Sequence, residues 1–99
     1  MGDLLVIRDK KVKSGLIIEM VVWELNPLLK ECSHCFKYRL FCGSLETGAC
    51  FVKYDNEQGK GDHRHADDKE QSYPFTDLER LFAGFEKDVR EVLKKCSGT

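Results

Sequence analysis

Most of the side chains that could carry chemistry lie in one stretch, YDNEQGKGDHRH, from Tyr54 to His65. Residues two apart in an extended segment point to the same side, so His63 and His65 should share one side, with Asp62 and Arg64 on the other. A paired imidazole site of this kind is compatible with a metal centre, with acid-base catalysis, or with a polar loop that is charged by chance. The residue types alone leave all three interpretations open.

Two histidines next to Lys60 suit the cleavage of RNA. One neutral imidazole can accept the proton of the 2′-hydroxyl, and one imidazolium can protonate the leaving 5′-oxygen. Lys60 and Arg64 would then stabilise the negative charge that builds on the phosphorane. Glycines on both sides of Lys60 allow positive φ and close approach of backbone N–H groups to a phosphate; they are Gly59 and Gly61. This chemistry needs no metal and no other cofactor.

The same two imidazoles could instead bind a divalent transition metal, with a carboxylate from Asp62, Asp67 or Asp68 as a further ligand. That alternative leads to a metal-dependent nuclease or phosphotransferase. His34 is a further imidazole that could join either site.

The cysteines form a second candidate metal site. Cys32 and Cys35 have the spacing of half a zinc site, and Cys42 and Cys50 could supply the other half. A strand predicted between Cys35 and Cys42 would separate its ends by about 20 Å, at roughly 3.3 Å per residue, which is too far for one zinc ion. Small buried hydrophobes are therefore the favoured interpretation of Cys42 and Cys50.

The first half of the chain predicts two hairpins. Residues 4–8 favour a strand, and residues 16–25 are β-branched and apolar until Glu24, with Ser14-Gly15 as the turn between them. The second of these strands is apolar on both pleat faces, which is typical of a central strand covered on both sides. Residues 36–42 and 50–55 alternate with a period of two and should pair antiparallel.

In the second hairpin, Lys37, Arg39 and Lys53 would share one face if the register aligns them. Such a face could contact the RNA backbone or could be merely solvated.

The last third of the chain predicts one long helix. Residues 56–72 are polar and predict a loop or an irregular strand. The pattern from Thr76 to Glu79 is a capping box, and apolar residues at helical spacing continue to Cys96, with Ser97-Gly98 as the stop signal. The predicted fold is a single α+β domain over residues 1–99: a four- or five-stranded, mainly antiparallel sheet with one long C-terminal helix packed on one face.

Composition restricts the setting more than the function. The chain has 99 residues, 41% hydrophobic and 33% charged, with a net charge of -1, so any nucleic-acid binding must come from a local arrangement. No apolar run is long enough for a signal peptide or a bilayer span, and the five cysteines are an odd number. We expect a cytoplasmic protein with reduced thiols and no membrane contact.

The combination of KYRL at 37–40, the stretch at 54–65, Glu70 and Tyr73-Pro-Phe75 before a C-terminal helix resembles the TumE-type toxins of prokaryotic toxin-antitoxin pairs. The resemblance implies a small cytoplasmic toxin, encoded beside a TumA-like helix-turn-helix antitoxin that binds and neutralises it. Ribonuclease action is the usual inference for such toxins. The matching positions are Lys37, Arg39, Asp55, Asn56, Gly59, Lys60, Gly61, Asp62, His63, Arg64 and His65.

The sequence thus predicts the toxin of a type II pair, acting as a metal-independent endoribonuclease on an RNA substrate. His63 and His65 would be acid and base, Lys60 and Arg64 the phosphate cations, and Asp62 or Asp55 the residue that orients a histidine. RNA contacts are expected from Lys37, Arg39, Lys53, Asp55, Asn56, Gly59 and Gly61. The main alternative is a non-enzymatic module that binds protein or nucleic acid. One helix covers one sheet face, so a homodimer is one way to cover the other.

Overall fold

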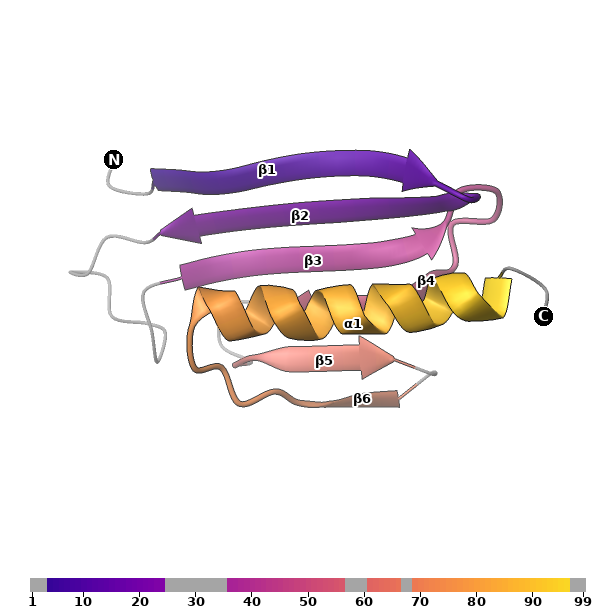
Figure 1. Ribbon diagram of the computed structural model, residues 1–99. Coiled ribbons are helices and arrows are strands. Elements are labelled where there is room, and N and C mark those ends of the chain that lie inside the picture. Colours follow the sequence, from indigo (N-terminus) through magenta and orange to yellow (C-terminus); the bar gives the residue numbers. More distant parts are fainter. Residues whose placement is uncertain (1–3, 25–35, 57–60, 67–68, 97–99) are drawn as a thin grey trace.

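The computed structural model describes residues 4–24, 36–56, 61–66 and 69–96. The described chain forms one six-stranded sheet whose strands follow one another in chain order, each antiparallel to its neighbour (Figure 1). The elements are β1 (Leu4–Lys13), β2 (Leu16–Glu24), β3 (Phe36–Ser44), β4 (Cys50–Asp55), β5 (His63–Ala66), β6 (Lys69–Ser72) and α1 (Leu78–Cys96).

The predicted α+β class is confirmed, with more strands than the four or five expected. The segment that was predicted to be a loop or an irregular strand contains β5 and β6. β6 has the sequence KEQS, and all four of its residues are exposed. A strand of this kind is held by backbone hydrogen bonds at the sheet edge, so it shows no apolar alternation that a sequence pattern could detect.

The predicted Ser14-Gly15 turn joins β1 to β2. Ser14 has a φ of 53° and Gly15 a φ of 79°, and positive φ at both central residues defines the turn type whose twist suits a hairpin. β1 continues to Lys13, beyond the predicted end at Arg8, because backbone pairing with β2 continues to Leu16.

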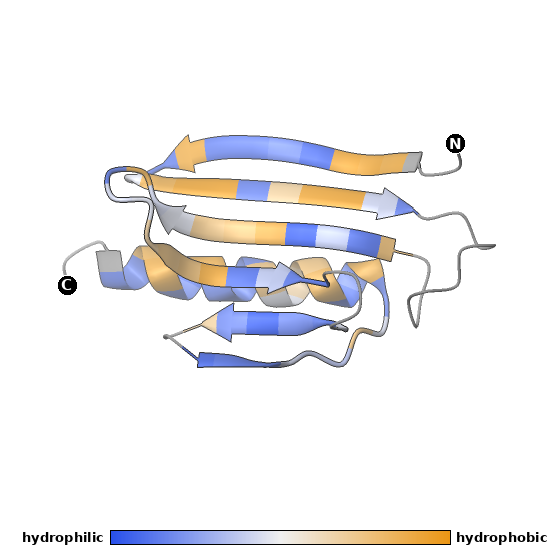
Figure 2. Ribbon diagram, turned by 180° about the vertical axis from the view of Figure 1, so that it is seen from behind, coloured by the Kyte–Doolittle hydropathy of each residue, from blue (hydrophilic) through white to orange (hydrophobic). Residues whose placement is uncertain are grey.

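The helix α1 lies along β4 on one face of the sheet (Figure 1). Alternate residues of β2, β3 and β4 point toward it and form the core with one side of the helix. The fully buried side chains are Phe85, Leu16, Leu40, Leu81, Val22 and Cys42. We call the opposite side the open face; it carries the intervening strand residues and faces the viewer in Figure 2.

Residues 16–25 were predicted to form a central strand covered on both sides; β2 is central, and within the described part of the chain α1 covers one of its sides. Its buried residues, such as Val22, all point toward α1. Val21 and Trp23 lie on the open face, where they are only partly buried. The apolar run in β2 therefore has two parts: one set of side chains packs against α1, and the alternate set, with Val21 and Trp23, lies partly exposed on the open face.

The helix begins one residue later than the capping box predicted. The backbone N–H of Arg80 donates to Asp77 Oδ1 at 2.8 Å, so Asp77 is the N-cap and the exposed Thr76 lies outside the helix. The predicted apolar stripe is confirmed by the burial of Leu81, Phe85 and Val89, and the stop signal Ser97-Gly98 lies outside the described residues. Among the described residues, no helix has both the length and the apolar character that crossing a bilayer requires.

Candidate functional site

Strand register brings many of the predicted site residues onto the open face in two rows that cross the sheet. Residues directly opposite each other on neighbouring strands share a face, and neighbouring strands are about 4.8 Å apart. We call one row the Arg39 row; from β1 to β6 it contains Arg8, Val21, Arg39, Asp55, His63 and Ser72. The adjacent Phe41 row contains Lys10, Glu19, Phe41, Lys53, His65 and Glu70.

The prediction that Lys37, Arg39 and Lys53 share one face is confirmed by this register. Arg39 Nη1 lies 3.5 Å from Glu19 Oε1, and Lys53 Nζ lies 3.4 Å from Asp55 Oδ2. The pair of Arg39 with Glu19 is near the surface and contributes little, so Arg39 can turn toward a bound anion at small cost. The partner of Lys53 is a largely buried carboxylate, so an anion that binds Lys53 competes with Asp55.

The two histidines also share the open face, as predicted, but their surroundings differ. His63 Nδ1 lies 3.6 Å from Glu70 Oε2, and His63 Nε2 is buried without a hydrogen-bond partner among the described residues. The ring of His65 is partly exposed and makes no hydrogen bond or ion pair within the described part of the chain. One side of the His63 ring thus faces a carboxylate, whereas the His65 ring has no such neighbour among the described residues.

Arg64 lies on the helix side of the sheet, away from the two histidines. Its Nε donates to Tyr54 Oη and to Asp88 Oδ2, both at 3.0 Å, and the Tyr54 hydroxyl donates to the same carboxylate at 2.5 Å. The hydrogen bond to Asp88 raises the pKa of Arg64, and burial raises the pKa of Tyr54. The alternation predicted for this segment is confirmed, but the structure does not bring Arg64 together with the histidines.

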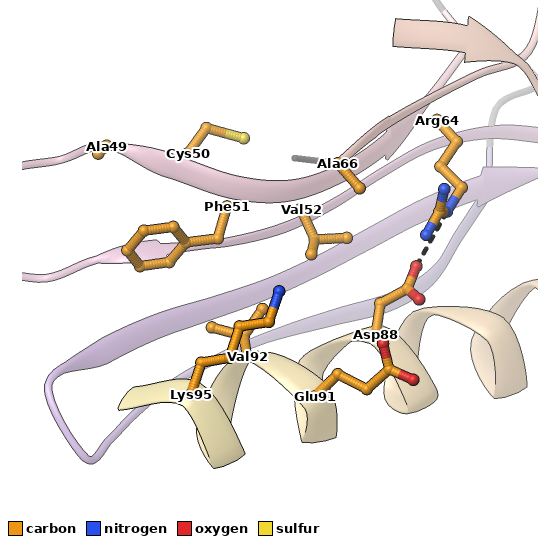
Figure 3. A pocket seen from close by; sticks show the side chains of 10 residues that line it. All are labelled: Ala49, Cys50, Phe51, Val52, Arg64, Ala66, Asp88, Glu91, Val92 and Lys95. Carbon is orange, nitrogen blue, oxygen red and sulfur yellow. Dashed lines mark hydrogen bonds and ion pairs between the residues drawn. The ribbon is translucent and has the colours of Figure 1, made fainter. Parts of the chain in front are cut away.

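Arg64 and Asp88 line a pocket of about 340 Å³ between β4, β5 and the C-terminal half of α1 (Figure 3). Glu91 and Lys95 of the helix line the same pocket, while Phe51 and Val52 form its apolar wall. The pocket therefore opens on the helix side and is separate from the open face.

Asp62 and Asn56 hold the ends of the strands. The Tyr38 hydroxyl donates to Asp62 Oδ2 at 2.6 Å, and the Tyr73 N–H donates to the Asp62 carbonyl at 2.9 Å. Burial, with Asp62 as the next cause, raises the pKa of Tyr38. Asn56 is only 5% exposed; its Oδ1 accepts from the Tyr38 N–H at 2.8 Å and its Nδ2 donates to the Phe36 carbonyl at 2.7 Å. Asn56 thus lies in the interior and contacts β3, and its contact with RNA stays a prediction.

Several predicted residues remain to be placed. Asp55 is buried on the open face, where it pairs with His63 in the register, and Gly61 has a φ of 76°, which glycine adopts without strain. Lys60 and Gly59 lie outside the described residues, as do the carboxylates and imidazole of the alternative metal site: Asp67, Asp68 and His34.

The cysteine zinc site is tested only in part, because Cys32 and Cys35 also lie outside the described residues. Cys42 is buried in the core as predicted. Cys50 is partly exposed, its strand partner is Gly43, and burial raises the pKa of its thiol. Within the described segments, no three or more His, Cys, Asp or Glu side chains are grouped as metal ligands.

Sequence reasoning missed two features of the site. Asp88 occupies the apolar side of the helix, three residues after Phe85 and four before Val92, so a carboxylate inside the apolar stripe was the available signal. The aromatic residues Trp23 and Phe41 were given no role in the site, although the period of two places Phe41 on the same face as Lys37 and Arg39.

Comparisons with known proteins add one finding. Searches of the curated proteins and of the solved structures gave no match. A family model described as Toxin TumE matches residues 3–93, which include all six strands and most of α1. The chain therefore belongs to the Toxin TumE family, as the combination of KYRL, the stretch at 54–65, Glu70 and Tyr73-Pro-Phe75 predicted.

Proposed function

We propose that this chain is the toxin of a type II toxin-antitoxin pair and acts as a metal-independent endoribonuclease. Family membership supports the toxin, and one structural observation supports the chemistry: His63 and His65 lie on the same sheet face as Lys37, Arg39 and Lys53. Acid-base groups and phosphate-binding cations on one face are what RNA cleavage by internal attack requires.

In the proposed reaction, His65 accepts the proton of the 2′-hydroxyl. The 2′-oxygen then attacks the phosphorus, the bond from phosphorus to the 5′-oxygen breaks, and protonated His63 gives its proton to the leaving oxygen. The products are a 2′,3′-cyclic phosphate and a 5′-hydroxyl. Lys53 is next to His65 in the Phe41 row, and Arg39 lies two strands from His63 in the Arg39 row. Both cations stabilise the negative charge on the phosphorane.

The roles follow from the contacts of each ring. The imidazole of His65 makes no contact that would occupy its nitrogens among the described residues, which suits a base. Glu70 at 3.6 Å forms an ion pair with His63 only when His63 is protonated, which suits an acid. His63 Nε2 is buried, so RNA must displace the atoms that cover this nitrogen. The leaving 5′-oxygen can then receive its proton.

The test is the cleavage of RNA by purified protein in EDTA. We expect wild-type protein to cleave, and His65→Ala and His63→Ala to lower the rate at least a hundredfold, roughly the contribution of an acid-base group. Lys87→Ala, at an exposed position of α1, is the matched control and should cleave like wild type. Circular dichroism establishes that each variant is folded.

Two results would change the proposal. RNA that stays intact under all conditions would favour the non-enzymatic binding module. Activity that is lost in EDTA and restored by one divalent ion would favour the metal-dependent nuclease.

The proposed partner is a helix-turn-helix antitoxin of the TumA type, and the proposed compartment is the cytoplasm. An open reading frame for such a protein beside this gene supports the pair. In bacteria, expression of the chain should stop growth and degrade RNA, and the double variant H63A/H65A should do neither.

A further inference from the structure

Two aromatic rings lie on the open face within reach of the basic side chains. Trp23 on β2 is the strand partner of Lys37, and Phe41 on β3 is the partner of Lys53. Both rings are partly exposed, on the side of the sheet that α1 does not cover. The proposed chemistry uses neither ring.

The Phe41 ring lies along the sheet surface. A Cβ built at Gly43, two residues further along β3, would come within 2.6 Å of Phe41 Cζ, so the ring occupies the space above that glycine. Arg39 Cζ lies 5.1 Å from the centroid of the same ring. Arg39 and Phe41 therefore form a cation-aromatic pair on the sheet, and both a guanidinium plane and an aromatic ring are surfaces on which nucleic-acid bases stack.

Charge on the open face is complementary to phosphate. The described strands place five Lys or Arg residues on it against three Asp or Glu, whereas the chain as a whole has a net charge of -1. The cations are Arg8, Lys10, Lys37, Arg39 and Lys53, and the acids are Glu19, Asp55 and Glu70.

The mixture of rings and cations favours RNA over a protein partner. The centre of a protein interface is depleted of lysine, but here each ring has a lysine as its cross-strand neighbour. Aromatic rings interleaved with basic side chains are the usual platform for single strands. In a duplex the bases are stacked on one another and cannot lie on a sheet.

We propose that the open face binds single-stranded RNA, with bases stacked on Trp23 and Phe41 and phosphates held by Lys37, Arg39 and Lys53. The proposal rests on the ribonuclease function and names its substrate class. His65 is two strands from Phe41 in the same row, roughly 10 Å away, so the stacked bases belong to nucleotides close to the scissile phosphate.

The experiment measures binding apart from cleavage. Fluorescence anisotropy of a short labelled RNA strand is recorded in EDTA with the His65→Ala protein, alone and with the complementary strand annealed. We expect the single strand to bind more tightly than the duplex. Trp23→Leu and Phe41→Leu, each added to His65→Ala, should weaken binding roughly tenfold, because stacking on an aromatic ring is lost while an apolar side chain remains.

Conservative variants show whether the rings act by stacking. Trp23→Phe and Phe41→Tyr should bind within about twofold of the parent, because a ring of similar size still stacks. Lys87→Ala, at an exposed position of α1 away from the open face, is the control substitution and should bind like the parent.

The outcomes separate this proposal from the ribonuclease proposal. If the leucine variants bind like the parent, or if the duplex binds as well as the single strand, the proposed platform is wrong even when wild-type protein cleaves RNA. If the rings are needed for binding but wild-type protein cleaves nothing, the platform stands and the ribonuclease proposal fails. A dimer that Trp23→Leu dissociates, with no RNA binding, would assign the open face to a second copy of the chain.

Discussion

The Nε atom of Arg64 lies 3.0 Å from Oδ2 of Asp88, and this contact ties β5 to the helix from the side of the sheet opposite His63 and His65. The two groups are largely buried, and the Tyr54 hydroxyl donates to the same carboxylate. Arg64 belongs to the motif that predicted a site, but its charge is used to hold the strand that carries the histidines.

Asp88→Ala should destabilise the fold by about 2 kcal/mol, because it leaves a largely buried guanidinium and a buried hydroxyl without their acceptor. Urea unfolding followed by tryptophan fluorescence measures the loss. Glu19→Ala, which removes the partly exposed partner of Arg39, is the matched control and should cost under about 1 kcal/mol. Equal urea midpoints for the two variants would contradict the structural role of the Arg64 contact.

The N-cap assignment gives a second prediction. Asp77→Ala should lower stability by about 1 kcal/mol, because the N–H of Arg80 loses its acceptor at the start of α1. Thr76→Ala, one residue earlier, should change stability by less than about 0.5 kcal/mol. Thermal unfolding of the two variants compares the positions directly, and a larger loss at Thr76 would restore the capping box that the sequence predicted.

These contacts show where sequence reasoning was sufficient. Alternation within β3 and β4 is a local property, so the shared face of Lys37, Arg39 and Lys53 followed from the period of two once the strands paired. The alternation also placed Arg64 opposite His63 and His65. The part of the candidate site that could be predicted is therefore the part that depends on strand geometry alone.

The other features of the fold and the site depend on contacts between residues far apart in the chain, or on which of two adjacent residues takes a role. Asp88 is 24 residues from Arg64, and no local pattern pairs them. Thr76 and Asp77 are both suitable N-cap residues. Which of them caps α1 depends on the position of the preceding Phe75, whose ring packs on Tyr38. β6 is polar throughout, so only its pairing with β5 reveals it.

Asn56 provides a test of a motif residue with a structural role. Asn56→Ala should destabilise the fold by about 2 kcal/mol, because a buried N–H of Tyr38 and a carbonyl of Phe36 both lose their partner. Gln71→Ala, on the exposed edge strand β6, is the control amide and should stay within about 0.5 kcal/mol of wild type. If Asn56→Ala were as stable as wild type yet failed to bind RNA, the contact predicted from the sequence would be supported instead.

Glu70 should act on cleavage by orienting His63. His63→Ala is expected to lower kcat by roughly a hundredfold or more, and Glu70→Ala should lower kcat by less than that. KM should change little in Glu70→Ala, because the base and the phosphate cations remain. Glu70→Gln keeps an oxygen that can accept from Nδ1 and should recover part of the rate. Lys69→Ala, its neighbour on β6, is the control. A rise in KM with constant kcat would show that Glu70 acts in binding and not in orienting the acid.

Two buried tyrosines and one partly buried tyrosine predict a loss of stability at alkaline pH. Burial, the largest cause in each case, raises the pKa of Tyr38, Tyr54 and Tyr73 above the ordinary 10.0. Above pH 10 the unfolded chain releases tyrosine protons that the folded chain keeps, so the stability present below that pH is lost as pH rises. Each such tyrosine contributes a slope of up to about 1.4 kcal/mol per pH unit.

The measurement is the urea midpoint as a function of pH between about 9 and about 11. Tyr38→Phe and Tyr54→Phe should each be less stable than wild type below pH 10, because Asp62 or Asp88 loses a hydrogen bond, and each should lose stability less steeply above it. The double variant should lose stability least steeply as pH rises, because it lacks two of the three hydroxyls whose protons the folded state retains. If the phenylalanine variants kept the slope of wild type, the alkaline loss would come from other groups, and the hydroxyls of Tyr38 and Tyr54 would not be held as the structure describes.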